Sequence, residues 1–149
     1  MAGRKVHLVL NRRARHLVAE EPLVHALRAS AGAATVHETR SLEELERVAE
    51  SIAAAGADVV VLAGGDGTYM AGVTALHRAF GDRMPMLALA PGGTVSTTAR
   101  NWGLRGPTVA YAQKLLGAIA TGAGDAVTRP TLRVRDDRGG DRIGQALFL

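Results

Sequence analysis

The sequence contains no cysteine, and aromatic residues make up only 3% of its 149 residues. Without thiols the chain can form neither a disulfide framework nor a thiolate metal site, which is consistent with a reducing compartment. The longest apolar runs are far too short to span a bilayer, so no transmembrane helix is expected. Residues 1–5 lead into a strand-like segment without the apolar region of a signal peptide. We therefore expect a cytoplasmic protein whose core is built from Ala, Val, Leu and Ile.

Lysine is also scarce. Lys5 and Lys114 are the only two, so arginine supplies almost all the positive charge behind the net charge of +4. The planar guanidinium suits phosphate binding because it donates two parallel hydrogen bonds. A genome rich in G and C would explain the same bias without any function. With so few aromatic residues and no alternation of basic and aromatic side chains, no nucleic-acid partner is expected.

Strand-like and helix-like segments alternate along the first part of the chain. Short apolar runs predict strands over 6–10, 34–37, 58–63 and 86–90. Apolar residues at helical spacing predict helices over 17–30, 41–55, 68–80, 95–102 and 108–121. The helix over 41–55 begins with a capping box formed by Ser41 and Glu44. This alternation predicts an α/β fold, a three-layer Rossmann-like domain with a mainly parallel sheet.

The character of the sequence changes after Gly122. Two strand candidates, over 131–135 and 143–149, are joined by a polar turn and predict a C-terminal β-hairpin. We therefore expect an α/β domain over 1–127 and the start of a truncated, β-rich second domain over 128–149. Unpaired edges and an apolar face on these strands favour a homodimer, disorder or aggregation.

The most informative segment is Gly64-Gly65-Asp66-Gly67-Thr68, between a predicted buried strand and a predicted helix. Glycines allow a ligand to approach the main chain closely. The start of the helix adds unpaired N–H groups and a partial positive charge. Thr68 can cap the helix or donate its hydroxyl to a phosphate oxygen. The segment therefore predicts a phosphate-binding loop.

Asp66 is unusual in such a loop. A carboxylate repels phosphates unless a divalent cation or a transferable proton lies between them. This favours phosphoryl transfer over passive anion binding and makes Asp66 the catalytic candidate. The alternative is an ordinary glycine-rich turn in which Asp66 caps the helix.

A second loop of the same design follows the next predicted strand and contains Gly93 and Thr94. In a parallel sheet both loops leave the carboxyl edge, where open α/β folds bind their ligands. Neither G-x-x-x-x-G-K-[ST] nor a G-x-G-x-x-G after the first strand is present, which disfavours P-loop proteins and dinucleotide dehydrogenases. The five histidines are scattered, are expected at the surface or its boundary, and predict no metal site.

At these two loops the sequence resembles the diacylglycerol kinase catalytic-domain family, which includes bacterial lipid kinases, sphingosine and ceramide kinases and, more distantly, NAD kinases. Gly64 to Thr68 match the family's G-G-D-G-T signature in full, and residues 91–94 resemble its P-L-G-T loop. The similarity covers residues 5 to about 135. The nucleotide-binding positions that the resemblance implies are Asn11, Arg12, Arg13, Thr39, Gly64, Gly65, Asp66, Gly67, Thr68, Gly93 and Thr94.

The resemblance also implies a function. We expect the ATP-binding domain of a lipid kinase, with ATP and Mg²⁺ as cofactors, that transfers the γ-phosphate to the hydroxyl of a diacylglycerol or sphingoid lipid. Such a kinase meets its substrate at the inner face of the membrane. The second domain is expected to complete the site, so this chain alone should be inactive.

Two departures from the family keep alternatives open. The family's Asn-Pro-x-x-Gly loop is Asn11-Arg12-Arg13-Ala14-Arg15 here, and its Gly-Asn-Asp after the second loop is Val95-Ser96-Thr97. The first alternative is a kinase of another hydroxyl acceptor such as NAD. The second is a non-catalytic nucleotide-binding or regulatory module.

Overall fold

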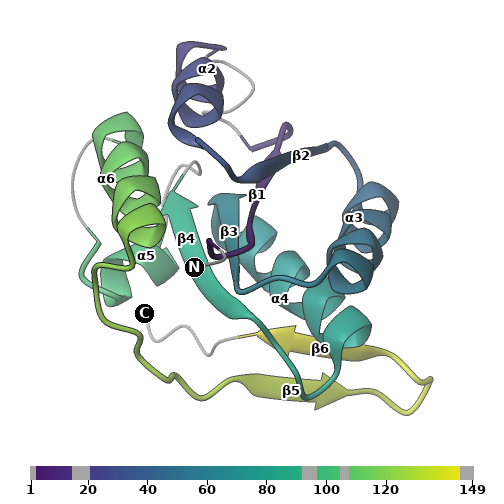
Figure 1. Ribbon diagram of the computed structural model, residues 1–149. Coiled ribbons are helices and arrows are strands. Elements are labelled where there is room, and N and C mark those ends of the chain that lie inside the picture. The colour runs from purple at the N-terminus through teal and green to yellow at the C-terminus, as the bar shows by residue number, and fades with distance from the viewer. Residues whose placement is uncertain (1–2, 15–20, 92–96, 105–107, 145–149) are drawn as a thin grey trace.

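The computed structural model describes residues 3–14, 21–91, 97–104 and 108–144 (Figure 1). The strands of the main sheet are β1 (Val6–Asn11), β2 (Thr35–Thr39), β3 (Val59–Gly64) and β4 (Met86–Pro91). The helices are α2 (Glu21–Ser30), α3 (Leu42–Ala55), α4 (Asp66–Phe80), α5 (Thr97–Asn101) and α6 (Thr108–Thr121). A separate hairpin consists of β5 (Leu132–Arg135) and β6 (Asp141–Gly144).

The four strands of the main sheet are all parallel and have the order β2-β1-β3-β4. All six residues of β3 are buried, because this strand has a neighbour on each side and helices on both faces. A continuous apolar run such as Val59 to Ala63 is typical of a parallel strand in this position. The predicted α/β fold with a parallel sheet is confirmed.

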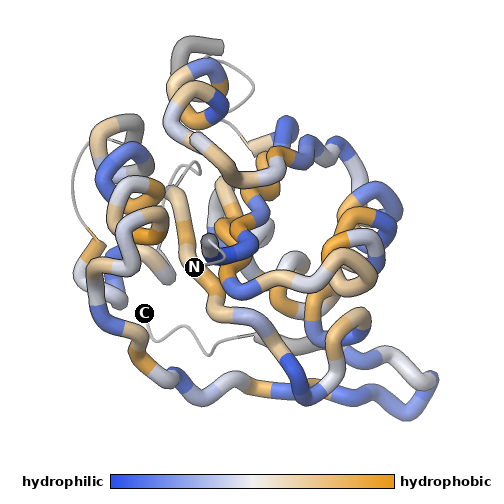
Figure 2. The backbone as a smooth tube through the Cα atoms, in the orientation of Figure 1, coloured by the Kyte–Doolittle hydropathy of each residue, from blue (hydrophilic) through white to orange (hydrophobic). Residues whose placement is uncertain are grey.

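Helices cover both faces of the sheet and complete three layers (Figure 1). On one face, α2 and α6 contribute Val24, Leu27, Leu116 and Ile119 to a core with Leu8, Leu10 and Val61. On the other face, α3 and α4 contribute Ile52, Val73 and Leu76 to a core with Val60 and Leu62. Figure 2 shows the apolar residues on the central strands and on the helix surfaces turned towards them. The two cores are built almost entirely from aliphatic side chains, as the composition predicts.

Several boundaries differ from those predicted. The helix expected from Thr68 begins two residues earlier, because Gly65 adopts the extended N-cap conformation and Asp66 is already in the first turn. The strand expected over 34–37 extends to Thr39. Strand β6 begins at Asp141, within the predicted polar turn, where it pairs with Arg135. Parts of the helices predicted over 17–30 and 95–102 and of the strand over 143–149 lie outside the described residues.

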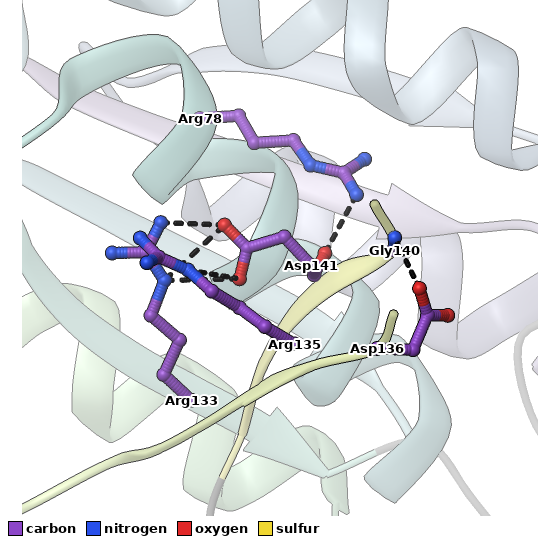
Figure 3. A network of polar contacts seen from close by, with 6 residues as sticks. All are labelled: Arg78, Arg133, Arg135, Asp136, Gly140 and Asp141. Carbon is purple, nitrogen blue, oxygen red and sulfur yellow. Dashed lines mark hydrogen bonds and ion pairs between the residues drawn. The ribbon is translucent and has the colours of Figure 1, made fainter. Parts of the chain in front are cut away.

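The predicted hairpin is antiparallel and packs with β6 against α4. A polar network joins them: Arg78 of α4 donates to the Asp141 carbonyl at 2.7 Å (Figure 3). Arg78 also pairs with Glu46 of α3 at 2.8 Å. The Asp141 carboxylate accepts three hydrogen bonds from the Arg133 guanidinium, at 2.9, 3.2 and 2.5 Å. All of β5 is exposed, including the apolar side chains of Leu132 and Val134.

Candidate functional site

A cleft of about 370 Å³ lies at the carboxyl ends of β1, β2 and β3. The chain runs from β1 to β2 on one side and returns to β3 on the other side of β1. In open α/β sheets such a reversal of strand order leaves a crevice above the strand ends, where ligands bind. The topology alone therefore indicates a candidate binding site between the ends of β1 and β3.

The last residues of these three strands bring together distant parts of the sequence. Asn11 ends β1 and lies opposite Thr39, the last residue of β2, in the sheet register. The backbone N–H of Arg12 donates to the carbonyl of Thr39 at 2.9 Å and continues the pairing of β1 with β2 by one residue. Asn11 and Thr39 both line the cleft. Thr39 is only 3% exposed, and no described residue forms a hydrogen bond with its hydroxyl.

Gly64 ends β3, and its missing side chain determines how closely α4 approaches the strand. A Cβ at Gly64 would lie 2.4 Å from the hydroxyl oxygen of Thr68 and 2.6 Å from its Cβ. Both distances are far below van der Waals contact, so only glycine allows this packing. Thr68 is thereby held over the end of β3, where it lines the cleft.

The amide groups at the start of α4 face this cleft. Gly65 is the N-cap and provides no side-chain hydrogen bond to them, and Gly65, Gly67 and Thr68 all line the cleft. The first N–H groups of a helix have no partner within the helix and carry its partial positive charge. Of the two roles predicted for Thr68, N-cap and hydroxyl donor, the structure therefore gives the N-cap position to Gly65.

Asp66 points away from its own helix towards α5. Its Oδ2 accepts a hydrogen bond from the backbone N–H of Thr97, and its Oδ1 accepts one from Thr98, both at 2.8 Å. Partial burial raises the pKa of this carboxyl group, but the hydrogen bonds from Thr98 and Thr97 outweigh burial and hold the pKa below its ordinary value of 3.8. Asp66 is thus a capping residue, but of the next helix along the chain.

The second glycine loop starts beside the first. Pro91, at the end of β4, is paired with Gly64 at the end of β3, and Thr97 is held by Asp66. Gly93 and Thr94, the predicted binding residues of this loop, lie outside the described residues. Pro91 and Thr97, the described residues on either side of this loop, are nevertheless both held next to the first glycine loop. One binding site shared by the two loops requires this arrangement.

The arginines that follow β1 point in different directions. Arg12 lies beside Glu38, with Nε 3.8 Å from the carboxylate, and does not line the cleft. Arg13 lines the cleft, and so does Arg40, which the sequence analysis missed. Among the described residues neither Arg13 nor Arg40 has an ion-pair partner. In the sequence, Arg40 could have been found from its position directly after Thr39, a predicted binding residue.

The lining of the cleft is cationic on one side and apolar on the other. Arg13, Arg40 and the start of α4 provide positive charge, and none of the described lining residues is acidic. Leu42, Leu45 and Ala71 provide apolar surface. Arg13 and Arg40 are both exposed at the rim, where their guanidinium groups can donate charge-assisted hydrogen bonds, so this lining fits an anion that also carries an apolar group.

No helix among the described residues is long and apolar enough to cross a membrane. No group of three or more His, Cys, Asp or Glu side chains is placed to hold a metal ion in the described ranges.

Fold and site together define a doubly wound α/β domain with a cleft at its switch point that two arginines and the start of α4 line. Residues 5–128 match the model of the diacylglycerol kinase catalytic domain, and the chain belongs to this family. No curated protein sequence matches the chain.

Solved structures show the same fold. A diacylglycerol kinase from Bacillus anthracis str. Sterne superposes with a TM-score of 0.62 at 23% sequence identity, covering 78% of this chain and 43% of that protein. Two further structures from this strain, described with less certainty as diacylglycerol kinases, give TM-scores of 0.63 and 0.62 at the same identity. They are covered over 43% and 42% of their length. The chain thus spans less than half the length of these proteins.

Proposed function

We propose that this chain is the nucleotide-binding part of an ATP-dependent lipid kinase, which transfers the γ-phosphate to the hydroxyl of a diacylglycerol or sphingoid lipid. The observation that carries the proposal is the cleft at the switch point, where the amide groups of α4 and two arginines face a space that no acidic residue of the described ranges lines. Its volume of about 370 Å³ falls within the range of small-molecule sites. Membership of the diacylglycerol kinase catalytic domain family supports the reaction class.

Each part of ATP has matching groups in the cleft. The phosphates would accept hydrogen bonds from the N–H groups of Gly67 and Thr68 and from the Thr68 hydroxyl. Arg13 and Arg40 would neutralise phosphate charge from the rim, and Leu45 would pack against the apolar part of the nucleoside. The roles predicted for Gly93 and Thr94 remain predictions.

Mg²⁺ would supply charge neutralisation between the phosphates during transfer. Asp66 does not itself line the cleft, but it belongs to the loop whose neighbours Gly65 and Gly67 do, and each of its oxygens retains a lone pair for the metal after accepting one N–H. Magnesium sites of this kind need only one or two carboxylates, because phosphate oxygens and waters complete the octahedron. The donor set therefore fits a nucleotide with its metal.

The second half of the active site is expected beyond the α/β domain. We propose that residues 1–127 form the nucleotide-binding domain and that 128–149 begin a β-rich domain. The exposed side chains of Leu132 and Val134 support this, because an apolar strand face normally packs against further structure. In this chain alone the same face would favour a homodimer, which light scattering would detect. The lipid would meet the full protein at the cytoplasmic face of the membrane.

Calorimetric titration with ATP and Mg²⁺ tests the nucleotide site. We expect saturable binding that Arg13→Ala and Arg40→Ala each weaken about tenfold, since a charge-assisted hydrogen bond contributes about 1.5–3 kcal/mol. Arg83→Ala is the control, because Arg83 is exposed in the turn before β4, at the opposite edge of the sheet. Absence of ATP binding, or equal effects of all three variants, would overturn the proposed site.

An ADP-release assay with diacylglycerol or sphingosine tests the second half of the proposal. We expect no turnover by this chain, since phosphoryl transfer depends on a fully assembled and charge-neutralised site. Robust turnover would show that the cleft is sufficient. Turnover with NAD as acceptor would favour an NAD kinase, and ATP binding without turnover in the full-length protein would favour a regulatory module.

A further inference from the structure

Helix α5 is short and depends on contacts with α4 for its position. It spans five residues, Thr97–Asn101, and a helix of this length has little stability of its own. Its first N–H groups have no partner within the helix. Asp66 supplies acceptors for two of them, one on each carboxylate oxygen, at 2.8 Å.

The other end of α5 is held by packing. Ala99 is buried in the core between the sheet and α4. Trp102, just after the helix, meets the ring of Tyr69 edge to face, with 5.2 Å between ring centroids and 89° between ring planes. Tyr69 and Asp66 both belong to α4. Two different interactions with one helix therefore fix the two ends of α5.

We propose that Asp66 is a positioning residue that fixes the start of α5 against the first glycine loop. Through this contact, anion binding at the start of α4 and the placement of α5 depend on each other. The effect of Asp66 on ATP binding rests on the proposed nucleotide site. The contact itself is a property of the fold.

This arrangement also explains how a carboxylate can lie in a phosphate-binding loop. The two N–H groups of Thr97 and Thr98 take up part of its negative charge, which lowers the repulsion felt by an anion at Gly67 and Thr68. They also favour the ionised form, so the carboxylate remains a double acceptor at neutral pH. A protonated carboxyl group would lose one of the two acceptor positions.

Amide hydrogen exchange measured by NMR on the free protein tests the contact directly. Asp66→Ala should increase amide exchange at Thr97 and Thr98 by about tenfold or more. In the variant these two N–H groups no longer donate to a carboxylate, so the local opening that permits exchange costs less free energy. The Trp102 amide should keep its protection, because it donates to the carbonyls of Thr98 and Ala99 and the ring contact with Tyr69 holds this end of the helix in place. Asp66→Asn, which retains one acceptor oxygen, should give an intermediate increase. Glu50→Ala, which removes one exposed acid of α3 with no hydrogen bond among the described residues, is the control for charge.

Nucleotide affinity in two buffers separates positioning from metal binding. If Asp66 acts by positioning α5, Asp66→Ala weakens ATP binding by a similar factor with Mg²⁺ and with EDTA. If its role is only to hold the metal, affinity falls in Mg²⁺ and rises in EDTA, where a repelling charge has been removed. That second pattern, or unchanged exchange at Thr97 and Thr98 in the folded variants, would overturn the inference. Should the wild-type chain bind no ATP, the proposed function fails while the exchange result still decides the role of Asp66.

Discussion

The side-chain amide of Asn11 donates a hydrogen bond to the hydroxyl of Thr68, with 2.6 Å between nitrogen and oxygen. This contact joins the end of β1 to the first turn of α4 across the switch point of the sheet. The side-chain oxygen Oδ1 of Asn11 accepts a hydrogen bond from the backbone N–H of Arg13 at 3.0 Å. The nitrogen and the oxygen of the Asn11 side-chain amide therefore each have a hydrogen-bond partner. Because the Thr68 oxygen accepts from Asn11, its own proton is left to be donated into the cleft.

Asn11→Asp should therefore weaken ATP binding by about tenfold or more, the effect expected for losing one charge-assisted hydrogen bond and adding a nearby like charge. The aspartate would still accept from Arg13, but it would also accept the Thr68 proton and turn it away from the ligand. Calorimetry with ATP and Mg²⁺ measures the change. Asn101→Asp makes the same chemical change at an exposed position at the end of α5 and should leave the affinity unchanged. Equal affinities for Asn11→Asp and the wild type would contradict this role of the Asn11 amide.

Gly64 and Gly67 should respond in opposite ways to alanine. Gly64→Ala would force Thr68 and the start of α4 away from β3 and should lower the free energy of unfolding by about 1–3 kcal/mol, the range for overpacking a filled site. Gly67 lies in the first turn of α4 with nothing within 4 Å of an added Cβ, so Gly67→Ala should preserve stability or raise it slightly.

Denaturant unfolding measures both variants, and ATP titration adds a second difference. Gly67 lines the cleft, so its methyl group should reduce ATP affinity without loss of stability. A Gly64→Ala protein as stable as the wild type would show that α4 can shift freely. Unchanged ATP affinity in Gly67→Ala would place the ligand elsewhere.

Much of the fold followed from patterns that are local in the sequence. The apolar run of β3 and the capping box of Ser41 and Glu44 both depend on neighbouring residues, and the structure shows the Glu44 N–H bonded to the Ser41 hydroxyl at 3.1 Å. The predicted start of α4 was two residues too late, because the N-cap is Gly65. A glycine N-cap has no side chain and leaves no capping signature in the sequence. His7, expected at the surface or its boundary, is buried because β1 is a central strand.

The candidate site was predictable only where a known motif marked it. Asn11, Thr39 and Thr68 come together as expected. Arg40 was missed because its place in the cleft depends on β2 lying beside β1, a strand order that no local pattern encodes. The bond from Thr98 to Asp66 was missed for the same reason, since it requires the chain to return from β4 to the end of β3.

His7 and His37 form a stacked pair on neighbouring strands, with 3.0 Å between His7 Nδ1 and His37 Nε2 and 5.3 Å between ring centroids. His7 Nε2 lies 3.3 Å from the Gly56 carbonyl, so this nitrogen carries a proton and donates it. His7 Nδ1 is then the acceptor for the His37 Nε2 proton. Lys5, at the same end of α3, donates to the Ala55 carbonyl and adds positive charge nearby. The arrangement accommodates two neutral rings.

Stability should therefore fall as the solution becomes mildly acidic. Burial, and then the neighbouring His7, lower the pKa of His37 below its ordinary value of 6.5. The unfolded chain consequently takes up a proton at a higher pH than the folded chain, so stability is full above about pH 6.5 and is lost as the pH falls from there towards the lower pKa of the folded state. Thermal unfolding at about pH 7.5 and about pH 5.5, on either side of the ordinary imidazole pKa, measures this loss. His37→Gln should reduce the difference between the two midpoints, whereas His25→Gln, at an exposed position of α2, should keep it. If the midpoint of His37→Gln falls as much as that of the wild type, the acid sensitivity has another origin, because removing this imidazole removes the proton uptake on which the effect depends.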